Sequence, residues 1–509
     1  MALADYYART AAAASQVLTG FDEETFRDTL SDTRLGIAFG PDVVSSGEGR
    51  ALLDLLVRLA SRLYPAVTLS PAGGAEELAH DLAALARDIN PAIDIDTGEP
   101  AVTVAVGPSA PPTTDAVIYA GSDGWDGHVS TQHPCPVGTT SNPFGAGAAA
   151  CLALANVFRM VFLGANAPSD QNATLSVLDR AAAPSASQPP ADTVDLGEVV
   201  LVGAGAIGNS ALWALGRTDA TGRIHIVDHE RVDLSNLQRY VLASRTDEGA
   251  VKADMGARHL PESLRPEPHP DTWAAFVDGA GYIWPRVLVA LDSAAHRRAV
   301  QATLPKWIAN AWTQPGDLGL SIHPTLHSGA CLACLYLPSG PVPSEDTLIA
   351  QVLGIPDRLM QIRELLFSGA GTPQDLLDSA ATALSLPLDR LLPFEGKPLR
   401  TLYTEGVCGG AVIPLDRVNG PAQEMHVPLA HQSALAGILL AGALVGAAAG
   451  RDPEATAVTR LDLMRPLADY LTQPAQKEGN GRCICEDGDF MAAYSAKYPR
   501  APVLRAVQT

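Results

Sequence analysis

Two kinds of apolar pattern alternate along the first 165 residues. Short runs in which every position is apolar or small, such as residues 35–39 and 102–106, predict buried strands. Between such runs, residues 48–63 place leucines at helical spacing, and residues 144–163 are apolar for long enough to predict a buried helix. Strands that alternate with helices are typical of an α/β layer with a largely parallel sheet.

The pattern changes twice further along the chain. Residues 166–196 are rich in Ala, Pro and Ser and predict a partly flexible linker. Residues 339–425 break a second α/β pattern with two helical stretches, and we interpret them as an insertion. The predicted organisation is therefore an α/β domain (1–165), the linker (166–196), a second α/β domain (197–338), the insertion (339–425) and a C-terminal return to the second domain (426–509).

Residues 433–450 form an apolar run that is long enough to cross a membrane. The run consists mostly of Ala and Gly and has polar neighbours, so a buried helix is the better interpretation and no membrane contact is expected. The first 20 residues hold no long apolar run behind a basic start, which argues against a signal peptide. We therefore expect a cytoplasmic protein.

A glycine run marks the start of the second α/β domain. The strand 199–202 leads into Gly203, Gly205 and Gly208, and a second strand ends at Asp228. In nucleotide-binding units the first glycine permits a tight turn, the second lets the backbone approach phosphate, and the third lets the helix pack on the strand. Asp228 follows at the distance expected of an acid that binds ribose. A nicotinamide dehydrogenase would show the same features.

Further polar residues follow at the predicted strand ends. Asn236 and Arg239 come just beyond the acid, Lys252 lies in the next segment, and Asp292 ends a third apolar strand. Arg and Lys neutralise phosphate charge, and a carboxylate can hold Mg²⁺ beside it. This set predicts a site for a triphosphate rather than for hydride transfer.

Composition restricts the partners. The chain has 509 residues, a length typical of about three domains. Its net charge is −21. An acidic surface argues against nucleic acid, whose binding requires basic surface. The basic residues of a Mg–ATP site must then be concentrated locally, as Arg239 and Lys252 would be.

The motifs from Gly203 to Asp292 resemble the adenylation core of the ubiquitin-activating enzyme superfamily, which includes the bacterial ThiF and MoeB adenylyltransferases. Two departures from the family are Gln238-Arg239-Tyr240 in place of Asn-Arg-Gln and Asp292-Ser293 in place of Asp-Asn. The resemblance implies a Rossmann-like fold over residues 197–338, with ATP and Mg²⁺ as cofactors.

The resemblance also bears on residues 1–165, which lack the glycine run and the Lys/Arg cluster. They resemble a degenerate, inactive copy of the adenylation fold, with an unrelated α/β domain as the alternative. In the family two such halves form a dimer-like pair, so we expect a homodimer or a pseudo-dimer within one chain. One half lends an arginine to the ATP of the other, and Arg27 or Arg34 could serve.

Two cysteine pairs predict a zinc site. Cys331 and Cys334 form a CxxC motif, Cys483 and Cys485 form a CxC motif, and two thiolate pairs complete one tetrahedral Zn²⁺ site. The family places a structural zinc at the first pair. A redox dithiol and buried cysteines are the alternatives, but the CxxC occurs in a strand-like run rather than at a helix start.

Three cysteines remain. Cys151 lies in an apolar helix, Cys135 in a Pro-rich loop, and Cys408 among three glycines in the insertion. A thiol that accepts an acyl group from a tethered adenylate needs open access, and the family keeps its thioester cysteine in this part of the chain. Cys408 is therefore the candidate nucleophile, with Cys135 as the alternative.

The resemblance implies an activating enzyme for a ubiquitin-like protein, which adenylates the partner's C-terminus, forms a thioester and delivers the acyl group to a conjugating enzyme. The alternatives are a ThiF- or MoeB-type adenylyltransferase for sulfur transfer, and a non-catalytic scaffold. A bacterial gene neighbourhood with a conjugating enzyme and a peptidase would suggest antiviral defence.

Overall fold

The computed structural model contains two compact units, residues 1–337 with 427–509 and residues 338–426. The residues that it describes are 3–95, 98–110, 114–164, 167–188, 194–337, 344–384, 386–403, 427–479 and 481–499. The predicted nucleophile, Cys408, lies outside the described residues.

The N-terminal half of the larger unit is built on a sheet with the strand order β3-β2-β1-β4-β5-β6-β7 among the described residues. Strands β1 to β5 are parallel, and β6 and β7 are antiparallel additions. The strands are Arg34–Phe39 (β1), Ala66–Pro71 (β2), Asp94–Ile95 (β3), Val102–Val106 (β4), Val117–Asp123 (β5), Asp126–Ser130 (β6) and Asn172–Ser176 (β7). The helices are Tyr7–Ser15 (α1), Glu23–Asp32 (α2), Pro41–Val44 (α3), Gly47–Leu63 (α4), Glu76–Ile89 (α5) and Pro143–Phe162 (α6).

The second half repeats this plan in a sheet of order β10-β9-β8-β11-β12-β13-β14-β15. Strands β8 to β12 are parallel, and β13, β14 and β15 are antiparallel. The strands are Asp195–Val202 (β8), Thr221–Val227 (β9), Pro266–His269 (β10), Arg286–Val289 (β11), Trp307–Gln314 (β12), Asp317–His323 (β13), Ala457–Leu461 (β14) and Thr472–Pro474 (β15). The helices are Ala206–Leu215 (α7), Lys252–Ala257 (α8), Trp273–Ala280 (α9), Ala294–Ala302 (α10), Ala430–Ala448 (α15) and Gly488–Lys497 (α16).

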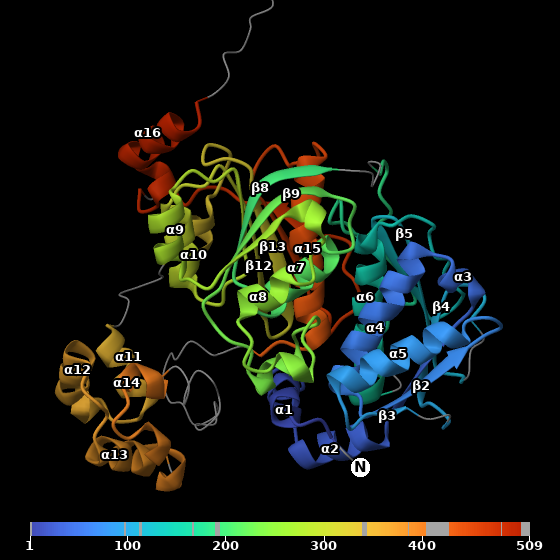
Figure 1. The fold of residues 1–509 in the computed structure, drawn as a ribbon, viewed down its shortest axis with the longest axis horizontal. Coiled ribbons are helices and arrows are strands. Elements are labelled where there is room, and N and C mark those ends of the chain that lie inside the picture. Colours follow the sequence, from blue (N-terminus) through green and yellow to red (C-terminus); the bar gives the residue numbers. More distant parts are fainter. Residues whose placement is uncertain are drawn as a thin grey trace, which may run out of the picture. The chain divides into compact units, whose positions relative to one another are not determined.

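The first seven strands of each half follow one topology. The order third-second-first-fourth-fifth-sixth-seventh is common to both, and in both a long apolar helix, α6 or α15, comes between the sixth and seventh strands. The expected α/β class with a Rossmann-like second domain is confirmed, and the shared strand order is what a degenerate copy predicts. The two halves lie side by side in Figure 1, with α6 and α15 between the sheets.

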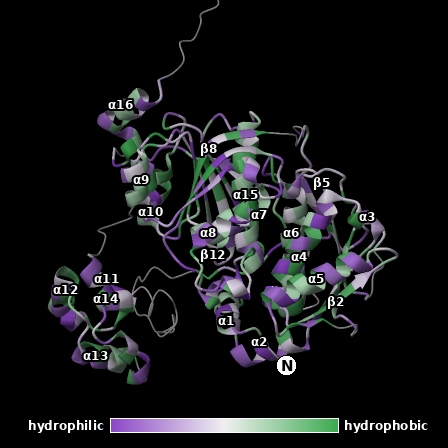
Figure 2. Ribbon diagram, viewed as in Figure 1, coloured by the Kyte–Doolittle hydropathy of each residue, from purple (hydrophilic) through white to green (hydrophobic). Residues whose placement is uncertain are grey.

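Small residues allow α6, α7 and α15 to pack closely. A Cβ at Gly147 of α6 would lie 2.8 Å from Ile438 of α15, and one at Gly437 would lie 2.3 Å from the carbonyl oxygen of Ile207. The Ala- and Gly-rich composition therefore sets the distance between these helices. Both α6 and α15 are long and apolar enough to cross a membrane, yet their apolar windows are 89% and 94% buried inside the protein. Figure 2 shows hydrophobic residues along α15 and hydrophilic ones on the outer helix α5.

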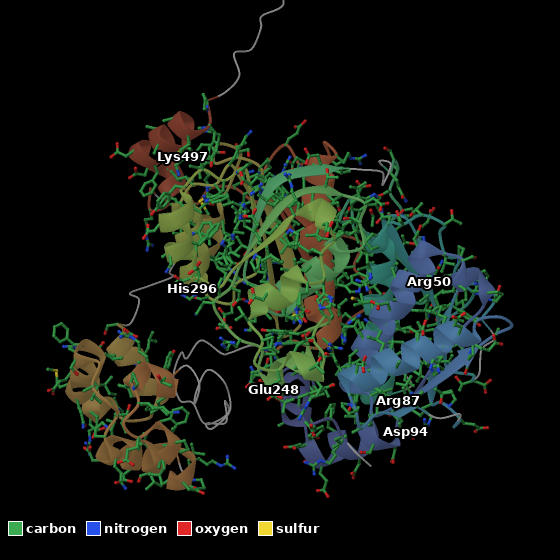
Figure 3. All side chains as sticks on the ribbon, in the orientation of Figure 1. Arg50, Arg87, Asp94, Glu248, His296 and Lys497 are labelled. Carbon is green, nitrogen blue, oxygen red and sulfur yellow. The ribbon has the colours of Figure 1, made fainter. Side chains whose placement is uncertain are left out.

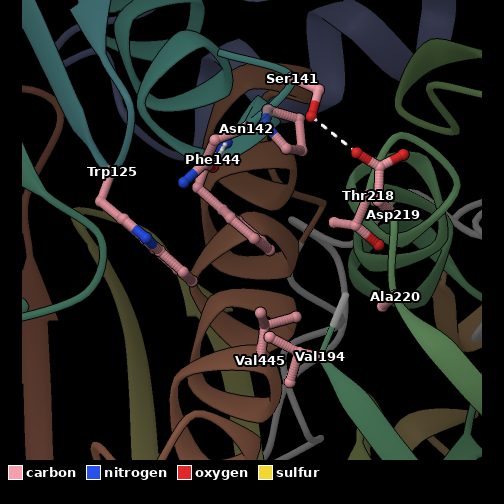
Figure 4. Close-up of a pocket in the computed structure, with 10 residues that line it drawn as sticks. Trp125, Ser141, Asn142, Phe144, Val194, Thr218, Asp219, Ala220 and Val445 are labelled. Carbon is pink, nitrogen blue, oxygen red and sulfur yellow. Dashed lines mark hydrogen bonds between the residues drawn. The ribbon is translucent and has the colours of Figure 1, made fainter. Parts of the chain in front are cut away.

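The boundary between the halves also contains a small apolar pocket (Figure 4). It is lined by residues that include Trp125 and Phe144 from the first half and Val194 from the second. Ser141 Oγ donates a hydrogen bond to Asp219 Oδ2 across it at 2.9 Å. The pocket thus belongs to the contact between the halves and lies apart from the glycine run.

The prediction of a linker over residues 166–196 is wrong for part of that range. Residues 172–176 form β7, which pairs with β6 at the end of the first sheet, and β8 begins at Asp195. Strand β7 reads Asn-Ala-Thr-Leu-Ser, and Leu175 is its only large apolar residue. An edge strand with one buried large side chain carries too weak an apolar pattern to stand out from an Ala-, Pro- and Ser-rich stretch.

The smaller unit is helical over its described residues. It contains Glu345–Val352 (α11), Leu359–Ser368 (α12), Gln374–Leu384 (α13) and Leu399–Thr401 (α14). Its own apolar core is formed by side chains such as Ile362, Leu377 and Leu391. The unit spans residues 338–426, which agrees within one residue at each end with the insertion predicted at residues 339–425.

Candidate nucleotide site

The glycine run adopts the geometry that its sequence predicts. Gly203 has a φ of +95°, and a Cβ there would lie 2.5 Å from the carbonyl oxygen of Ala290. A Cβ at Gly208 would lie 2.0 Å from the carbonyl oxygen of Gly203, so the third glycine lets helix α7 pack on the turn. Gly205 is the N-cap of α7, and a Cβ there would make only an ordinary van der Waals contact, with the Tyr240 hydroxyl at 3.5 Å. Backbone N–H groups at this helix start are suited to an anion.

Asp228 is fixed against this turn at the end of β9. Its Oδ2 accepts a hydrogen bond from the backbone N of Ala204 at 2.7 Å, and its Oδ1 accepts one from Glu230 N at 2.9 Å. Burial raises the pKa of Asp228, while Lys252 and the two backbone donors oppose that shift. The carboxylate is thus held beside the glycine turn, as a ribose-binding acid requires.

Lys252 is the first residue of α8, and its ammonium is buried among acceptors. It forms an ion pair with Glu230 and lies 5.3 Å from the centre of the Tyr240 ring. Burial lowers the pKa of Lys252, but Tyr240, Glu230 and Asp228 outweigh burial and raise the pKa above its ordinary value. Lys252 therefore remains charged at neutral pH.

Arg239 follows the short 3-10 helix η1 (Leu234–Gln238), which Asn236 helps to cap by accepting a hydrogen bond from Asp233 N at 3.1 Å. The Arg239 guanidinium lies 5.6 Å from the centre of the Tyr240 ring. Burial lowers the pKa of Arg239, and among the acids that oppose this is Asp292. Asp292 is exposed in the loop after β11, where its carboxylate is open to a cation.

Tyr240 connects the predicted residues and was not predicted. The Tyr240 hydroxyl would lie 3.5 Å from a Cβ at Gly205. The Tyr240 ring forms cation–π contacts with both Arg239 and Lys252. Tyr240 occupies one of the two positions at which the sequence departs from Asn-Arg-Gln, and this departure places a ring near both cations.

The N-terminal half contributes an arginine, although not one of those predicted. Arg27 pairs with Glu23 and Arg34 with Asp94, both within the first half. Arg9 belongs to α1, a helix that contacts η1, and lies near enough to Arg239 for the two charges to interact. Burial, followed by the charge of Arg239, lowers the pKa of Arg9 to about 10. Sequence reasoning missed Arg9 because nothing in the local pattern of α1 indicates what it packs against.

The first half also supports the segment that follows Arg239. Arg62 of α4 donates hydrogen bonds to the carbonyl oxygens of Tyr240 and Ala243, each at 2.5 Å. Arg58 of the same helix donates to Val241 O at 2.9 Å. One face of α4 therefore holds the loop that carries Arg239 and Tyr240.

In the first half, a carboxylate occupies the start of the corresponding helix. Glu48, in the first turn of α4, is completely buried and accepts hydrogen bonds from Ser122 Oγ, Gly124 N and Thr140 Oγ1 at 2.7, 2.9 and 2.7 Å. A fixed negative charge repels phosphate. The first half thus lacks an anion site at α4, as a degenerate copy would.

The four predicted zinc ligands converge in the second half. Cys331 and Cys334 flank the start of η4 (Leu332–Tyr336), a 3-10 turn rather than the predicted strand-like run, and Cys483 and Cys485 flank the start of η10 (Ile484–Glu486). The Sγ–Sγ distances given by these contacts range from 3.2 to 3.9 Å. Thiolates bound tetrahedrally at about 2.3 Å lie about 3.8 Å apart. The four buried sulfurs could therefore hold zinc, which would join the C-terminal segment to the domain.

The other described cysteines are closed to solvent. Cys135 is 4% exposed, and its Sγ lies 3.8 Å from Tyr119 O. Burial raises the pKa of the Cys135 thiol to about 11 and raises the pKa of Cys151 further. Neither thiol is suited to nucleophilic attack at neutral pH.

A sheet of mainly parallel strands, a glycine turn after β8 and the cations Arg239 and Lys252 between β9 and the start of α8 define a Rossmann-like nucleotide-binding protein. Residues 181–276 match the ThiF family, and residues 38–163 match the family described as Prokaryotic E2 family C. The chain belongs to the ubiquitin-activating (ThiF) superfamily, whose members are adenylyltransferases.

Individual relatives match the chain over different lengths. The chain is 45% identical over 507 residues, 98% of both chains, to "Uncharacterized protein y4jF" of Sinorhizobium fredii. It is 30% identical to a sulfur carrier protein adenylyltransferase of Thermus thermophilus, over 29% of this chain and 59% of that protein. It is 33% identical to the Nedd8-activating enzyme E1 catalytic subunit of Drosophila melanogaster, over 21% of this chain and 24% of that protein. A crystal structure of Escherichia coli MccB aligns at 14% identity with a TM-score of 0.33, over 57% of this chain and 67% of that one.

Proposed function

We propose that this chain activates a ubiquitin-like protein. The C-terminal carboxylate of that protein attacks the α-phosphate of ATP and releases pyrophosphate, and an enzyme thiol then takes the acyl group as a thioester and releases AMP. The observation that supports the proposal most directly is that Asp228 is bonded to the glycine turn while Tyr240, beside the same turn, has Arg239 and Lys252 near its ring. The partial match to a Nedd8-activating enzyme supports the same class of substrate.

Each residue has a place in the adenylation step. The α7 N-terminus and Lys252 would hold phosphate oxygens, and Asp228 would hold the ribose hydroxyls. Arg239 and Arg9 supply positive charge where negative charge accumulates, which is worth most in a buried site. Asp292 is the candidate for a Mg²⁺ ligand beside them. Positioning and charge, rather than covalent chemistry by the protein, carry this step.

For the thioester step we propose Cys408 in the inserted unit. Six of the seven cysteines are described; four form the zinc cluster, and the thiols of Cys135 and Cys151 are buried. Cys408 is the cysteine that remains. Although residues 38–163 match a family with an E2 description, the buried Cys135 argues for a supporting role of the first half rather than for acyl transfer by it.

The adenylation proposal is tested by thermal shift and by ATP–pyrophosphate exchange. Mg–ATP at about 100 times its Kd should stabilise the protein by about 2.7 kcal/mol, whereas NAD should not. Lys252→Ala and Asp292→Ala should fold normally and lose exchange activity with a ubiquitin-like protein encoded beside the gene. Lys306→Ala, an exposed lysine of the same half, is the matched control and should keep it. Full exchange in both site variants would contradict the proposal.

The thioester proposal is tested separately. Cys408→Ala should retain pyrophosphate exchange and lose the reductant-sensitive adduct on a non-reducing gel, because the two steps use different groups. Cys135→Ala should retain both. The opposite pattern would identify Cys135 as the nucleophile.

Sulfur transfer in cofactor synthesis is the second candidate. It is favoured by the matches to the sulfur carrier protein adenylyltransferase and to an "Adenylyltransferase and sulfurtransferase UBA4" of Lodderomyces elongisporus, 26% identical over 42% of this chain and 49% of that protein. Adenylation of a partner without any adduct on the enzyme would favour this second function.

A further inference from the structure

A second group of metal-ligand side chains lies in the second half, separate from the four cysteines. His225 is on β9, Glu267 and His269 are on β10, and one ligand atom of each lies within 4.8 Å of the others. The two strands are parallel, with Glu267 opposite His225 in the register. Because alternate residues of a strand share a face, all three side chains project from the same face of the sheet.

The distances suit one small cation. His225 Nδ1 lies 3.0 Å from His269 Nε2 and 3.3 Å from Glu267 Oε2. Ligand atoms bound tetrahedrally at about 2.0–2.1 Å, as imidazole and carboxylate bind zinc, lie about 3.4 Å apart. A single hydrogen on His225 Nδ1 can bond well to only one of its two neighbours, His269 Nε2 or Glu267 Oε2. A cation at the centre would bind all three of these atoms.

Outer partners orient two of the three ligands. The other ring nitrogen of His225, Nε2, lies 3.3 Å from Glu198 Oε1 on β8. The second oxygen of Glu267, Oε1, accepts a hydrogen bond from Arg223 at 2.5 Å. A histidine that donates its far N–H to a carboxylate is the usual arrangement behind a metal ligand, because it fixes the tautomer that binds.

The surroundings leave one side of the group accessible. His225 is buried, whereas Glu267 and His269 are half-buried. The rings of Phe276 and Trp284 cover the group, 4.7 Å from the His269 ring and 5.3 Å from the His225 ring respectively. An apolar wall on one side and partial exposure on the other are compatible with three protein ligands and a fourth from solvent.

We propose that His225, Glu267 and His269 form a second metal site, specific for a divalent ion of the zinc class. The two-His, one-carboxylate ligand set is a common one for zinc. The site is independent of the four-cysteine cluster, whose ligands come from η4 and η10. It lies on the strands that lead to Asp228, since the backbone N of Asp228 donates to His269 O at 3.1 Å.

The test is zinc stoichiometry on tag-free, full-length protein, dialysed against Zn²⁺ and then against metal-free buffer. Wild type should retain two equivalents per chain. His269→Ala and the near-isosteric Glu267→Gln should each retain one, and His259→Ala, an exposed histidine of the same half, should retain two. Circular dichroism and the melting temperature confirm that each variant is folded. One equivalent in wild type, or two in both site variants, would overturn the proposal.

Chelation provides a second readout. Zinc should leave wild type in two phases, because the half-exposed histidine site is more accessible than the buried cysteine cluster. The fast phase, from the histidine site, should be absent from Glu267→Gln. In Cys331→Ser the slow phase from the cysteine cluster should be absent and only the fast phase should remain. A single phase in wild type would contradict two separate sites.

Discussion

Arg9 of the first half lies near Arg239 of the candidate nucleotide site, and its replacement gives the first prediction. Arg9→Ala should reduce pyrophosphate exchange by up to about 10²-fold, because a positive charge near the transferred phosphate is lost. The melting temperature should change little. Arg27→Ala is the matched control, since Arg27 pairs with Glu23 on the exposed face of α2. A loss of exchange in Arg27→Ala but not in Arg9→Ala would reverse the assignment.

His431 gives a prediction of pH dependence. It is buried in α15 beside Phe158, and burial, with the charge of Arg159, lowers the pKa of His431 to about 3. The unfolded chain binds a proton near pH 6.5, so the stability that neutral His431 contributes is present above that pH and is lost as the pH falls toward about 3. From about pH 7.5 to about pH 5.5, wild type should lose about 1.4 kcal/mol more than His431→Leu. Denaturant unfolding at each pH measures the difference, and parallel curves would contradict the prediction.

The sequence predicted those site residues whose roles depend on local geometry. Gly203 and Gly208 follow a strand and lead into a helix, so the local pattern was sufficient for them, whereas Lys252, expected at a strand end, is the first residue of α8. The local pattern could not predict Tyr240, whose ring lies near two cations, or Arg9, whose helix α1 contacts η1 from a remote segment. Both depend on contacts between parts of the chain that are distant in sequence.

At the scale of elements, the cysteine cluster connects two short turns that are about 150 residues apart. Cys331→Ser should lose one equivalent of zinc and lower the melting temperature, because a structural zinc contributes directly to folding. The α16 segment beyond the cluster should become more sensitive to protease. Cys151→Ala is buried but remote from the cluster and should keep its zinc. Unchanged zinc in Cys331→Ser would exclude it as a ligand.

The elements differ in how well the sequence predicts them. Helix α4 was predicted at residues 48–63 and spans Gly47–Leu63, because its leucines repeat at helical spacing. Helix α15 was predicted at residues 433–450 and spans Ala430–Ala448. The short antiparallel strands β6 and β7 were missed, since few of their residues are large and apolar.

At the scale of the molecule, Asp54 joins the two halves. Its Oδ2 accepts hydrogen bonds from Arg58 of α4 and from Trp213 and Arg217 of the second half, at 2.9, 2.7 and 2.7 Å. Asp54→Ala should cost about 2–3 kcal/mol, because three donors lose their charged acceptor. Denaturant unfolding measures this loss. Asp81→Ala, an exposed acid on α5, should be nearly neutral, and an equal loss in both variants would contradict the role of Asp54.

The outer surface shows why charge must be concentrated at the site. Charged side chains such as Arg50, Arg87 and Glu248 lie on the exterior (Figure 3). Acids outnumber bases there, as the net charge of −21 requires. Among the buried or half-buried cations, Arg9, Arg62, Arg239 and Lys252 lie near the candidate nucleotide site or support its loop, rather than on the general surface.

The presence of both sheets in one chain has a consequence for dilution. Two separate subunits that share a site dissociate when their concentration falls below the dissociation constant, and the shared arginine is lost with the partner. Here α1 and α4 are covalently connected to the glycine turn, so their effective concentration at the site does not depend on how many molecules are present. Each molecule therefore carries both halves of its site even when very few copies exist in a cell.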